Sequence, residues 1–245
     1  MKTFPTVLIV VLDLTAAFAA IAPVLEVCNR NDPALAQCIL GVVDKIRPNI
    51  ASGDFGGNWT APPLDPLRID GIDIDQGSSF TTKLWNITIN GVSGFVIRRF
   101  QVDLPNMMLN ASVKIPSTLV TGMYHLNMNI LLLRLAGEGP FNLTLNNTIV
   151  NLKIKFYLVP KDGKNYVRFH PIGMNIKFND ARFYLKNLFN GEPTLEAIGN
   201  QAINANPYVL LDEVEPALVG KLTSTMTEIA NAVVAGSDID ELLPP

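Results

Sequence analysis

Regular alternation of apolar and polar residues in the middle of the chain is the feature that most limits its fold. Apolar side chains recur at every second position in residues 124–132, 141–145 and 150–158. A period of two is that of a β-strand with one buried and one hydrated face. Shorter alternating runs cover residues 85–89, 167–169 and 174–178. The alternation therefore predicts a sheet of antiparallel strands with one apolar face.

A helical pattern precedes these strands. Asp32 and Pro33 resemble an N-cap and a first helical residue, and apolar side chains then recur at helical spacing. We expect one helix over residues 33–51, kinked at Pro48 because proline removes a backbone donor. Gly53 is the expected end of that helix.

A second helical pattern follows the strands. We expect a helix over residues 192–205, a break at Pro207, and a further helix that continues to about residue 235. A run of strands between helices is typical of the α+β class. With no linker or change in composition, the pattern predicts one domain over residues 20–245.

The first 19 residues have the pattern of a secretory signal peptide. Lys2 supplies a positive start, residues 7–14 are mostly apolar, and Ala17-Phe18-Ala19 fits the small-x-small cleavage pattern. Cleavage after Ala22 is the alternative. Asp13 argues against a retained membrane anchor, because a span needs about 20 apolar residues with few charges. We therefore expect a secreted, extracellular protein.

Cys28 and Cys38 both remain after the expected cleavage. In an oxidising compartment a disulfide between them is the default expectation, and two free thiols are the alternative. The loop that it closes is small, so its contribution to stability is about 2–3 kcal/mol.

Five N-x-[ST] triplets are candidate glycosylation sites. They begin at Asn58, Asn86, Asn110, Asn142 and Asn146. Asn86, Asn142 and Asn146 fall on the polar faces of predicted strands. Within each of these triplets we expect the Asn and the Ser or Thr to share a face, because the strand period is two.

Charge and composition exclude several classes of function. The chain has 19 Lys and Arg against 22 Asp and Glu, so it lacks the basic excess of a nucleic-acid-binding protein. With two His and two Cys, a zinc site with several ligands is not expected. Asp70, Asp73 and Asp75 lack the glycine and glutamate of a calcium loop and fit a polar strand face. We expect no metal and no cofactor.

Catalytic motifs are also missing from the sequence. The segment Gly91–Phe95 lacks the spacing of a serine-nucleophile elbow, and residues 137–142 lack the last glycine of a dinucleotide loop. The candidate imidazole bases are His125, interpreted as exposed, and His170, at a strand end. We predict that the protein is not an enzyme; an enzyme acting on lipid esters or epoxides through His125 is the weaker alternative.

Six segments spread over the mature chain form an ordered set. They are VCNRNDPALAQC, KIRPNIASG, PPLDPLRIDGI, TGMYHLNMNILLLRLAGEGPFNLTL, LKNLFNGEPTLEAIGNQAINANP and DIDELLPP. Together they resemble the insect takeout and haemolymph juvenile-hormone-binding protein family. The chain departs from that family at Leu242-Leu243-Pro244, where relatives often have Leu-Phe-Pro, and at Pro207, where they often keep an aromatic residue.

The resemblance implies an α+β fold in which a strongly curved antiparallel sheet wraps a long helix, a TULIP-like super-roll around an elongated hydrophobic tunnel. It implies a carrier, found in haemolymph or another extracellular fluid, that performs no chemistry. The expected partner is a small hydrophobic ligand such as juvenile hormone, another terpenoid or a fatty-acyl-like lipid. No nucleic acid and no stable membrane insertion are expected. The family's early disulfide corresponds to Cys28 and Cys38.

Apolar strand positions are the candidate walls of this tunnel. They are Trp85, Ile89, Tyr124, Leu126, Ile130, Phe141, Leu143, Leu152, Phe156 and Phe178. Each fits an ordinary core equally well. Tyr124 stands out because its ring can form a wall while its hydroxyl contacts a ligand.

A different binding function is the main alternative. A secreted module could bind a membrane or microbial lipid surface through an apolar groove and a cationic tip. Arg98 and Arg99, with Phe95 and Phe100 nearby, form the cluster that would support it.

Overall fold

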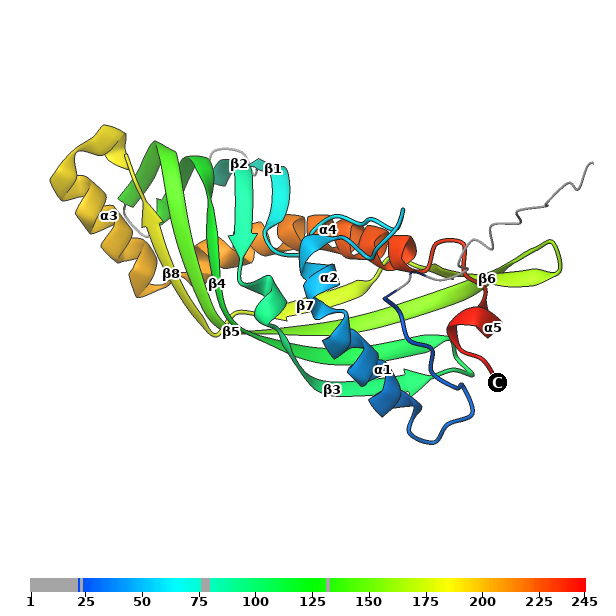
Figure 1. Ribbon diagram of the computed structural model, residues 1–245. Coiled ribbons are helices and arrows are strands. Elements are labelled where there is room, and N and C mark those ends of the chain that lie inside the picture. The colour runs from blue at the N-terminus through cyan, green and yellow to red at the C-terminus, as the bar shows by residue number, and fades with distance from the viewer. Residues whose placement is uncertain (1–21, 23, 76–79, 131–132) are drawn as a thin grey trace, which may run out of the picture.

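One curled antiparallel sheet dominates the computed structural model, which describes residues 22, 24–75, 80–130 and 133–245 (Figure 1). The predicted signal peptide, residues 1–19, lies outside these ranges and stays a prediction. The strands within them are β1 (Leu67–Asp75), β2 (Phe80–Asn90), β3 (Val96–Asp103), β4 (Met108–Ile130), β5 (Leu133–Lys161), β6 (Lys164–Phe169), β7 (Gly173–Lys177) and β8 (Asp180–Leu185). The predicted antiparallel sheet is confirmed.

β4 and β5 are the longest strands, and the other strands are arranged around them. They pair with each other from Met108 and Lys155 at one end to Ile130 and Leu133 at the other. The sheet order is β1-β2-β4-β5-β6, with β3 also on β4 and with β7 and β8 also on β5. Figure 1 shows that both long strands bend sharply near the middle, so the sheet curls into a trough.

The bend of β4 and β5 coincides with a change in which residues face inward. The inward positions of β4 are odd-numbered up to Ile115 and even-numbered from Thr118. In β5 they are odd-numbered up to Leu145 and even-numbered from Thr148. The register does not change, because Ile115 opposes Thr148 and Thr118 opposes Leu145. One extra outward residue in each strand, at the same level, thus keeps the apolar face on the concave side.

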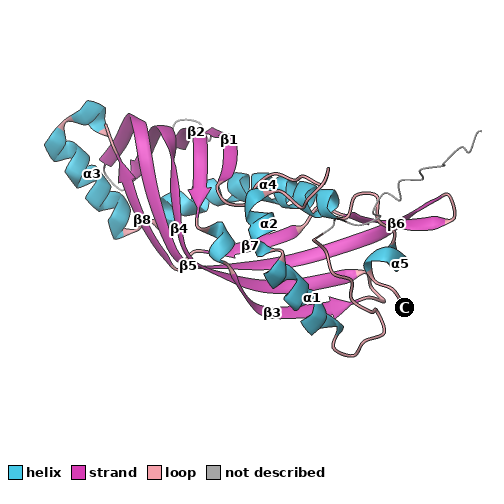
Figure 2. Ribbon diagram, viewed as in Figure 1, coloured by secondary structure: helices cyan, strands magenta, loops and turns pink. Residues whose placement is uncertain are grey.

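Helices line the inside and the ends of the trough (Figure 2). They are α1 (Leu35–Lys45), α2 (Arg47–Ser52), α3 (Pro193–Ala205), α4 (Tyr208–Val233) and α5 (Ile239–Leu242), with short 3-10 turns η1 (Val92–Gly94) and η2 (Phe189–Gly191). The long helix α4 runs along the concave side and contacts β1, β6 and β7, whereas α3 packs on β8 and α1 on β3. The predicted long helix wrapped by a strongly curved sheet is confirmed.

The first helix differs from the prediction. The single kinked helix over residues 33–51 is replaced by α1 and α2, which are separated at Ile46. Pro48 lies in the first turn of α2, where its missing N–H costs no helical hydrogen bond, so the chain starts a new helix there. Gly53 ends α2 as predicted, with a left-handed φ of 77°. The predicted break at Pro207 is confirmed, since α3 and α4 lie on either side of it.

Side-chain amides of α3 cover the open edge of β8. Asn200 accepts a hydrogen bond from the Leu185 N–H (2.8 Å) and donates one to the Leu185 carbonyl (2.9 Å). Asn204, one helical turn later, makes the same pair with Phe183, at 2.8 Å each. β8 pairs with β5 on its other side, so the two amides take the place of a neighbouring strand.

Helix α4 protects the region after β6 in a similar way. The Asn231 side-chain oxygen accepts from the Phe169 N–H at 3.0 Å. The Thr227 hydroxyl oxygen accepts from the Ile172 N–H, and the Thr223 hydroxyl donates to the Ile172 carbonyl. Helix side chains therefore satisfy backbone groups that a closed barrel would satisfy with strands.

We predict that Asn200→Ala lowers the free energy of unfolding by about 2–3 kcal/mol, because the buried N–H and the buried carbonyl of Leu185 then lose their hydrogen-bond partners. Chemical denaturation followed by circular dichroism measures the change. The matched control is Gln201→Ala, an exposed position on the same helix, which should leave stability within about 0.5 kcal/mol. Equal effects of the two substitutions would contradict the edge-capping role.

Candidate functional site

A cavity of about 380 Å³ lies inside the trough and is the candidate site. Strands β1 to β5, β7 and β8 form its wall, and α4 lies along its other side. Among the lining side chains that the structure describes, only Thr82, Thr118, Tyr124 and Thr148 carry a nitrogen or oxygen atom, and the rest are aliphatic, aromatic or Met. Such a site removes a hydrocarbon from water but offers nothing to a charged group.

Seven of the ten predicted wall residues line this cavity. They are Ile89, Tyr124, Leu126, Phe141, Leu143, Leu152 and Phe178. Gly122 lies opposite Phe141, and a Cβ on it would come within 2.9 Å of the Phe141 ring, so a glycine is needed for that ring to lie across β4. That these side chains bind a ligand is still a prediction.

Trp85 and Phe156 lie elsewhere. A bulge at Asn86, where φ is 52°, shifts the pairing of β2 with β4, so Leu84 and Ile87 face the cavity and Trp85 does not. The prediction for Trp85 fails because it assumed unbroken alternation. Phe156 lies beyond the cavity and packs edge-on against Phe169, with ring centroids 6.4 Å apart. The side chain of Ile130 lies outside the described residues.

Sequence reasoning missed many wall residues, and no predicted wall residue came from α4 or β3. These two elements contribute Leu210, Leu211, Val214, Leu218, Leu222 and Met226 from α4, and Ile97 and Phe100 from β3. The helical spacing of the α4 set was visible in the sequence, but periodicity alone does not say which surface a helix faces.

Two of the four polar side chains in the lining already have protein partners. The Tyr124 hydroxyl donates to the Lys186 carbonyl at 2.9 Å, and the Thr82 hydroxyl donates to the His125 carbonyl at 3.1 Å. Burial raises the pKa of the Tyr124 phenol, and the Glu196 carboxylate raises it further. Tyr124 is thus a neutral wall residue whose hydroxyl proton is already used in the hydrogen bond to the Lys186 carbonyl.

The loop at 91–95 brings Val92 and Phe95 to the cavity and is clamped from two sides. The Asp65 carboxylate accepts hydrogen bonds from the Gly91 N–H, the Ser93 N–H and the Ser93 hydroxyl. Burial by itself would raise the pKa of Asp65, but the bonds from Ser93 and Gly91 together lower it. On the other side, Arg47 donates to the Ser93 and Phe95 carbonyls and stacks 4.1 Å from the Phe95 ring centroid.

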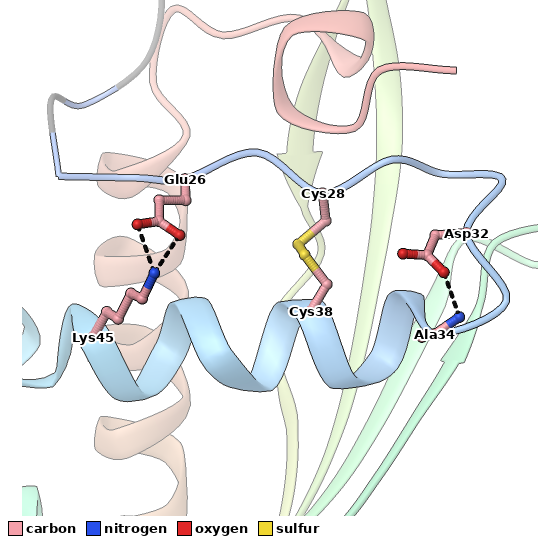
Figure 3. Close-up of a disulfide and its surroundings, with 6 residues drawn as sticks. All are labelled: Glu26, Cys28, Asp32, Ala34, Cys38 and Lys45. Atoms are coloured by element: carbon pink, nitrogen blue, oxygen red, sulfur yellow. Dashed lines mark hydrogen bonds and ion pairs between the residues drawn. A yellow bond between two sulfur atoms is a disulfide. The ribbon is translucent and has the colours of Figure 1, made fainter.

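The predicted disulfide between Cys28 and Cys38 forms and fastens the N-terminal segment to α1 (Figure 3). Glu26 and Lys45 form an ion pair on one side of it, with 2.6 Å between carboxylate oxygen and Nζ. Asp32 accepts from the Ala34 N–H on the other side, at 2.7 Å. These contacts hold the segment alongside α1, with the two running in opposite directions (Figure 3).

The candidate glycosylation sites differ in their surroundings. Asn58, Asn86 and Asn142 are exposed, whereas Asn110 and Asn146 are half-buried. The expectation that Asn146 and Thr148 share a face is wrong, because the phase change of β5 lies between them and turns Thr148 into the cavity. Their glycosylation remains a prediction.

The other residues considered in the sequence lie on the surface. His125 is exposed and contacts Glu138, and His170 is exposed and packs against Tyr157, so neither reaches the cavity. Within the described ranges, His, Cys, Asp and Glu form no cluster of three that could hold a metal ion. The helices of those ranges include none with the length and apolar character to cross a membrane.

Matches to known proteins span most of the chain. The family model "Haemolymph juvenile hormone binding protein (JHBP)" matches residues 7–244. A Schistocerca gregaria protein named "Putative beta-carotene-binding protein" is 24% identical over 225 residues, which cover 89% of this chain and 88% of that protein. The crystal structure of Epiphyas postvittana Takeout 1 is similar in fold, with a TM-score of 0.77 and 23% identity over 90% of this chain and 100% of that chain.

We predict that Asp65→Asn lowers the free energy of unfolding at pH 7 by about 1–2 kcal/mol, because charge-assisted hydrogen bonds to the 91–95 loop weaken. A carboxylate whose pKa is lowered on folding stabilises the protein fully above its ordinary pKa of 3.8, and this contribution is lost as the pH falls below that value. The difference between wild type and variant should therefore shrink below about pH 4.

Urea denaturation at a series of pH values measures this difference. Asp70→Asn, which removes the same charge from the exposed face of β1, is the control and should have little effect. A difference that stays constant from pH 7 down to pH 3 would contradict the role assigned to the Asp65 carboxylate.

Proposed function

Because the chain belongs to the haemolymph juvenile hormone binding protein family, we propose that it is a secreted carrier that holds one small hydrophobic ligand in the cavity of the curled sheet. The observation that carries this proposal is the chemistry of the lining. A cavity of about 380 Å³ is within the range of small-molecule sites, and its wall, as far as the described residues form it, is apolar except for four hydroxyl-bearing side chains. The proposed carrier performs no chemical step.

The physics of burial supports a useful affinity. A ligand of about 15–20 carbon atoms buries on the order of 15 methylene equivalents, which gives a gross transfer free energy of about 12 kcal/mol. Loss of translational and rotational freedom and ordering of the ligand offset roughly 4 kcal/mol or more. The remainder corresponds to a dissociation constant of about 1 μM without any polar contact.

The proposed ligand classes are juvenile hormone, another terpenoid or a fatty-acyl-like lipid. The name of the family and that of the Schistocerca gregaria relative both point to extended, hydrophobic small molecules. Lys, Arg and His are absent from the described lining, so a negatively charged group on the ligand would be buried without a cationic partner. The ligand is therefore best sought among neutral molecules.

Secretion is part of the same proposal. The N-terminal pattern of residues 1–19 fits a signal peptide, and the Cys28–Cys38 disulfide suits an oxidising compartment. The family takes its name from haemolymph proteins, which supports an extracellular fluid as the place of action.

The alternative of a module that binds a lipid surface has less support. Arg98 and Arg99 are exposed on β3, but Phe95 and Phe100 line the cavity and do not form an exposed aromatic patch beside them. A cationic pair without apolar anchors gives weak and salt-sensitive membrane binding.

We predict that the secreted, deglycosylated protein carries a neutral small molecule, detected by native mass spectrometry and identified after solvent extraction. The bound mass should disappear when the protein unfolds, because the site exists in the folded state alone. A protein that is empty and also fails to take up a terpenoid ester or a fatty-acid methyl ester would contradict the carrier function.

A substitution on the helix side of the cavity tests the location. Leu218→Trp places a larger ring in the cavity and should weaken ligand binding by at least about tenfold in a fluorescence displacement assay. Val219→Trp, at the next position of α4 and outside the lining, is the matched control and should bind within about twofold of wild type. Equal loss in both variants would place the ligand elsewhere.

A further inference from the structure

One fully buried hydroxyl in the described cavity wall, that of Thr148, has no protein partner. The Thr148 side chain is 5% exposed and lines the cavity, and its Oγ1 makes no hydrogen bond to any residue in the described part of the chain. Thr82 and Tyr124, by contrast, donate to backbone carbonyls. A buried hydroxyl without a partner is costly, so each such group in a folded protein requires an explanation.

The position of Thr148 follows from the bend of the sheet. Unbroken alternation from Leu145 would turn Thr148 outward, but the extra residue at Asn147, with φ of 54°, turns it inward. Its cross-strand partner is Ile115, and the neighbouring inward residues on β5 are Leu145 and Val150. None of these three side chains offers an acceptor to the hydroxyl, and the next inward residue of β4, Thr118, lies opposite Leu145 and not opposite Thr148.

Solvent is a poor substitute for a protein partner at this point. An ordered buried water needs two to four polar partners, and the polar side chains of the described lining are the four hydroxyl-bearing ones alone. Two of those four donate to the backbone already. A group brought in by the ligand would satisfy Thr148 directly and without displacing a well-held water.

We propose that Thr148 is a specificity-determining residue whose hydroxyl donates to an uncharged oxygen of the ligand, an ester, ketone or aldehyde carbonyl. This rests on the proposed carrier function and narrows its ligand class. A carbonyl oxygen accepts hydrogen bonds and needs no donor of its own, which matches a described lining whose polar groups are all hydroxyls. A carboxylate fits poorly, because the described lining holds no cation.

A matched series of four probes tests the proposal. Tridecane and its ketones, with the carbonyl at carbon 2, 4 or 7, have the same chain length and differ in one oxygen. We expect the wild-type protein to bind at least one ketone about five- to tenfold more tightly than tridecane in a displacement assay. Thr148→Val, which keeps the shape and removes the hydroxyl, should abolish that preference while tridecane binds as before. Both proteins are compared without N-linked glycans, because the substitution also removes the candidate triplet at Asn146.

Two controls separate specificity from damage. Thr121→Val is the same substitution at an outward position of β4, outside the cavity lining, so this variant should keep the preference for the ketone. Thr148→Val should melt at a temperature no lower than wild type, because it removes an unpartnered buried hydroxyl.

The outcomes distinguish the two proposals. Equal affinity of the wild type for ketones and tridecane, or a preference that survives in Thr148→Val, would overturn the role of Thr148 and leave the carrier function standing. A wild-type protein that binds neither tridecane nor any of the ketones would overturn both proposals.

Discussion

The structure depends on a sheet that bends sharply without exposing its apolar face. A strand that curved smoothly would keep its regular alternation of inward and outward side chains, and each residue would take up a small part of the bend. Here β4 and β5 each add one outward residue at the same level, so their register is retained while the inward parity changes on both. Ile115 and Thr118 on one strand, and Leu145 and Thr148 on the other, mark the point. Everything that lies inside the trough, including α4, follows from that coordinated change.

A trough, unlike a closed barrel, leaves strand edges that must be satisfied. Asn200 and Asn204 of α3 act as a substitute strand along β8, and Thr223, Thr227 and Asn231 of α4 do the same beyond β6. These helices are therefore attached through the edges as well as through apolar packing. Because the helices are also held at the strand edges, side chains of α4 need not interdigitate tightly with those of the concave face. This is consistent with a cavity beneath α4.

The sequence could predict the class of fold and much of the wall, because both rest on periodicity. The inward sets from 141 to 145 and from 150 to 154 and the helical set after Pro207 were all visible as patterns. What could not be predicted were the points where a pattern changes phase. Asn86 and Asn147 both adopt positive φ, and nothing in their neighbours distinguishes them from other strand asparagines. Trp85 was misplaced for that reason, and the inward position of Thr148 was missed.

The bend that shapes the cavity also places a polar side chain, Thr148, at one level of its wall, where it could favour one orientation of the ligand. Apolar walls bind in proportion to the area they bury and hold a ligand equally well in several orientations. A polar group in such a wall is costly when it has no hydrogen-bond partner and favourable when the ligand supplies one. It therefore discriminates between ligands more sharply than added apolar area does. Valine would fill the space of Thr148 without that cost. A threonine at the one level where β5 changes phase is therefore better explained by what enters the cavity than by the stability of the sheet that surrounds it.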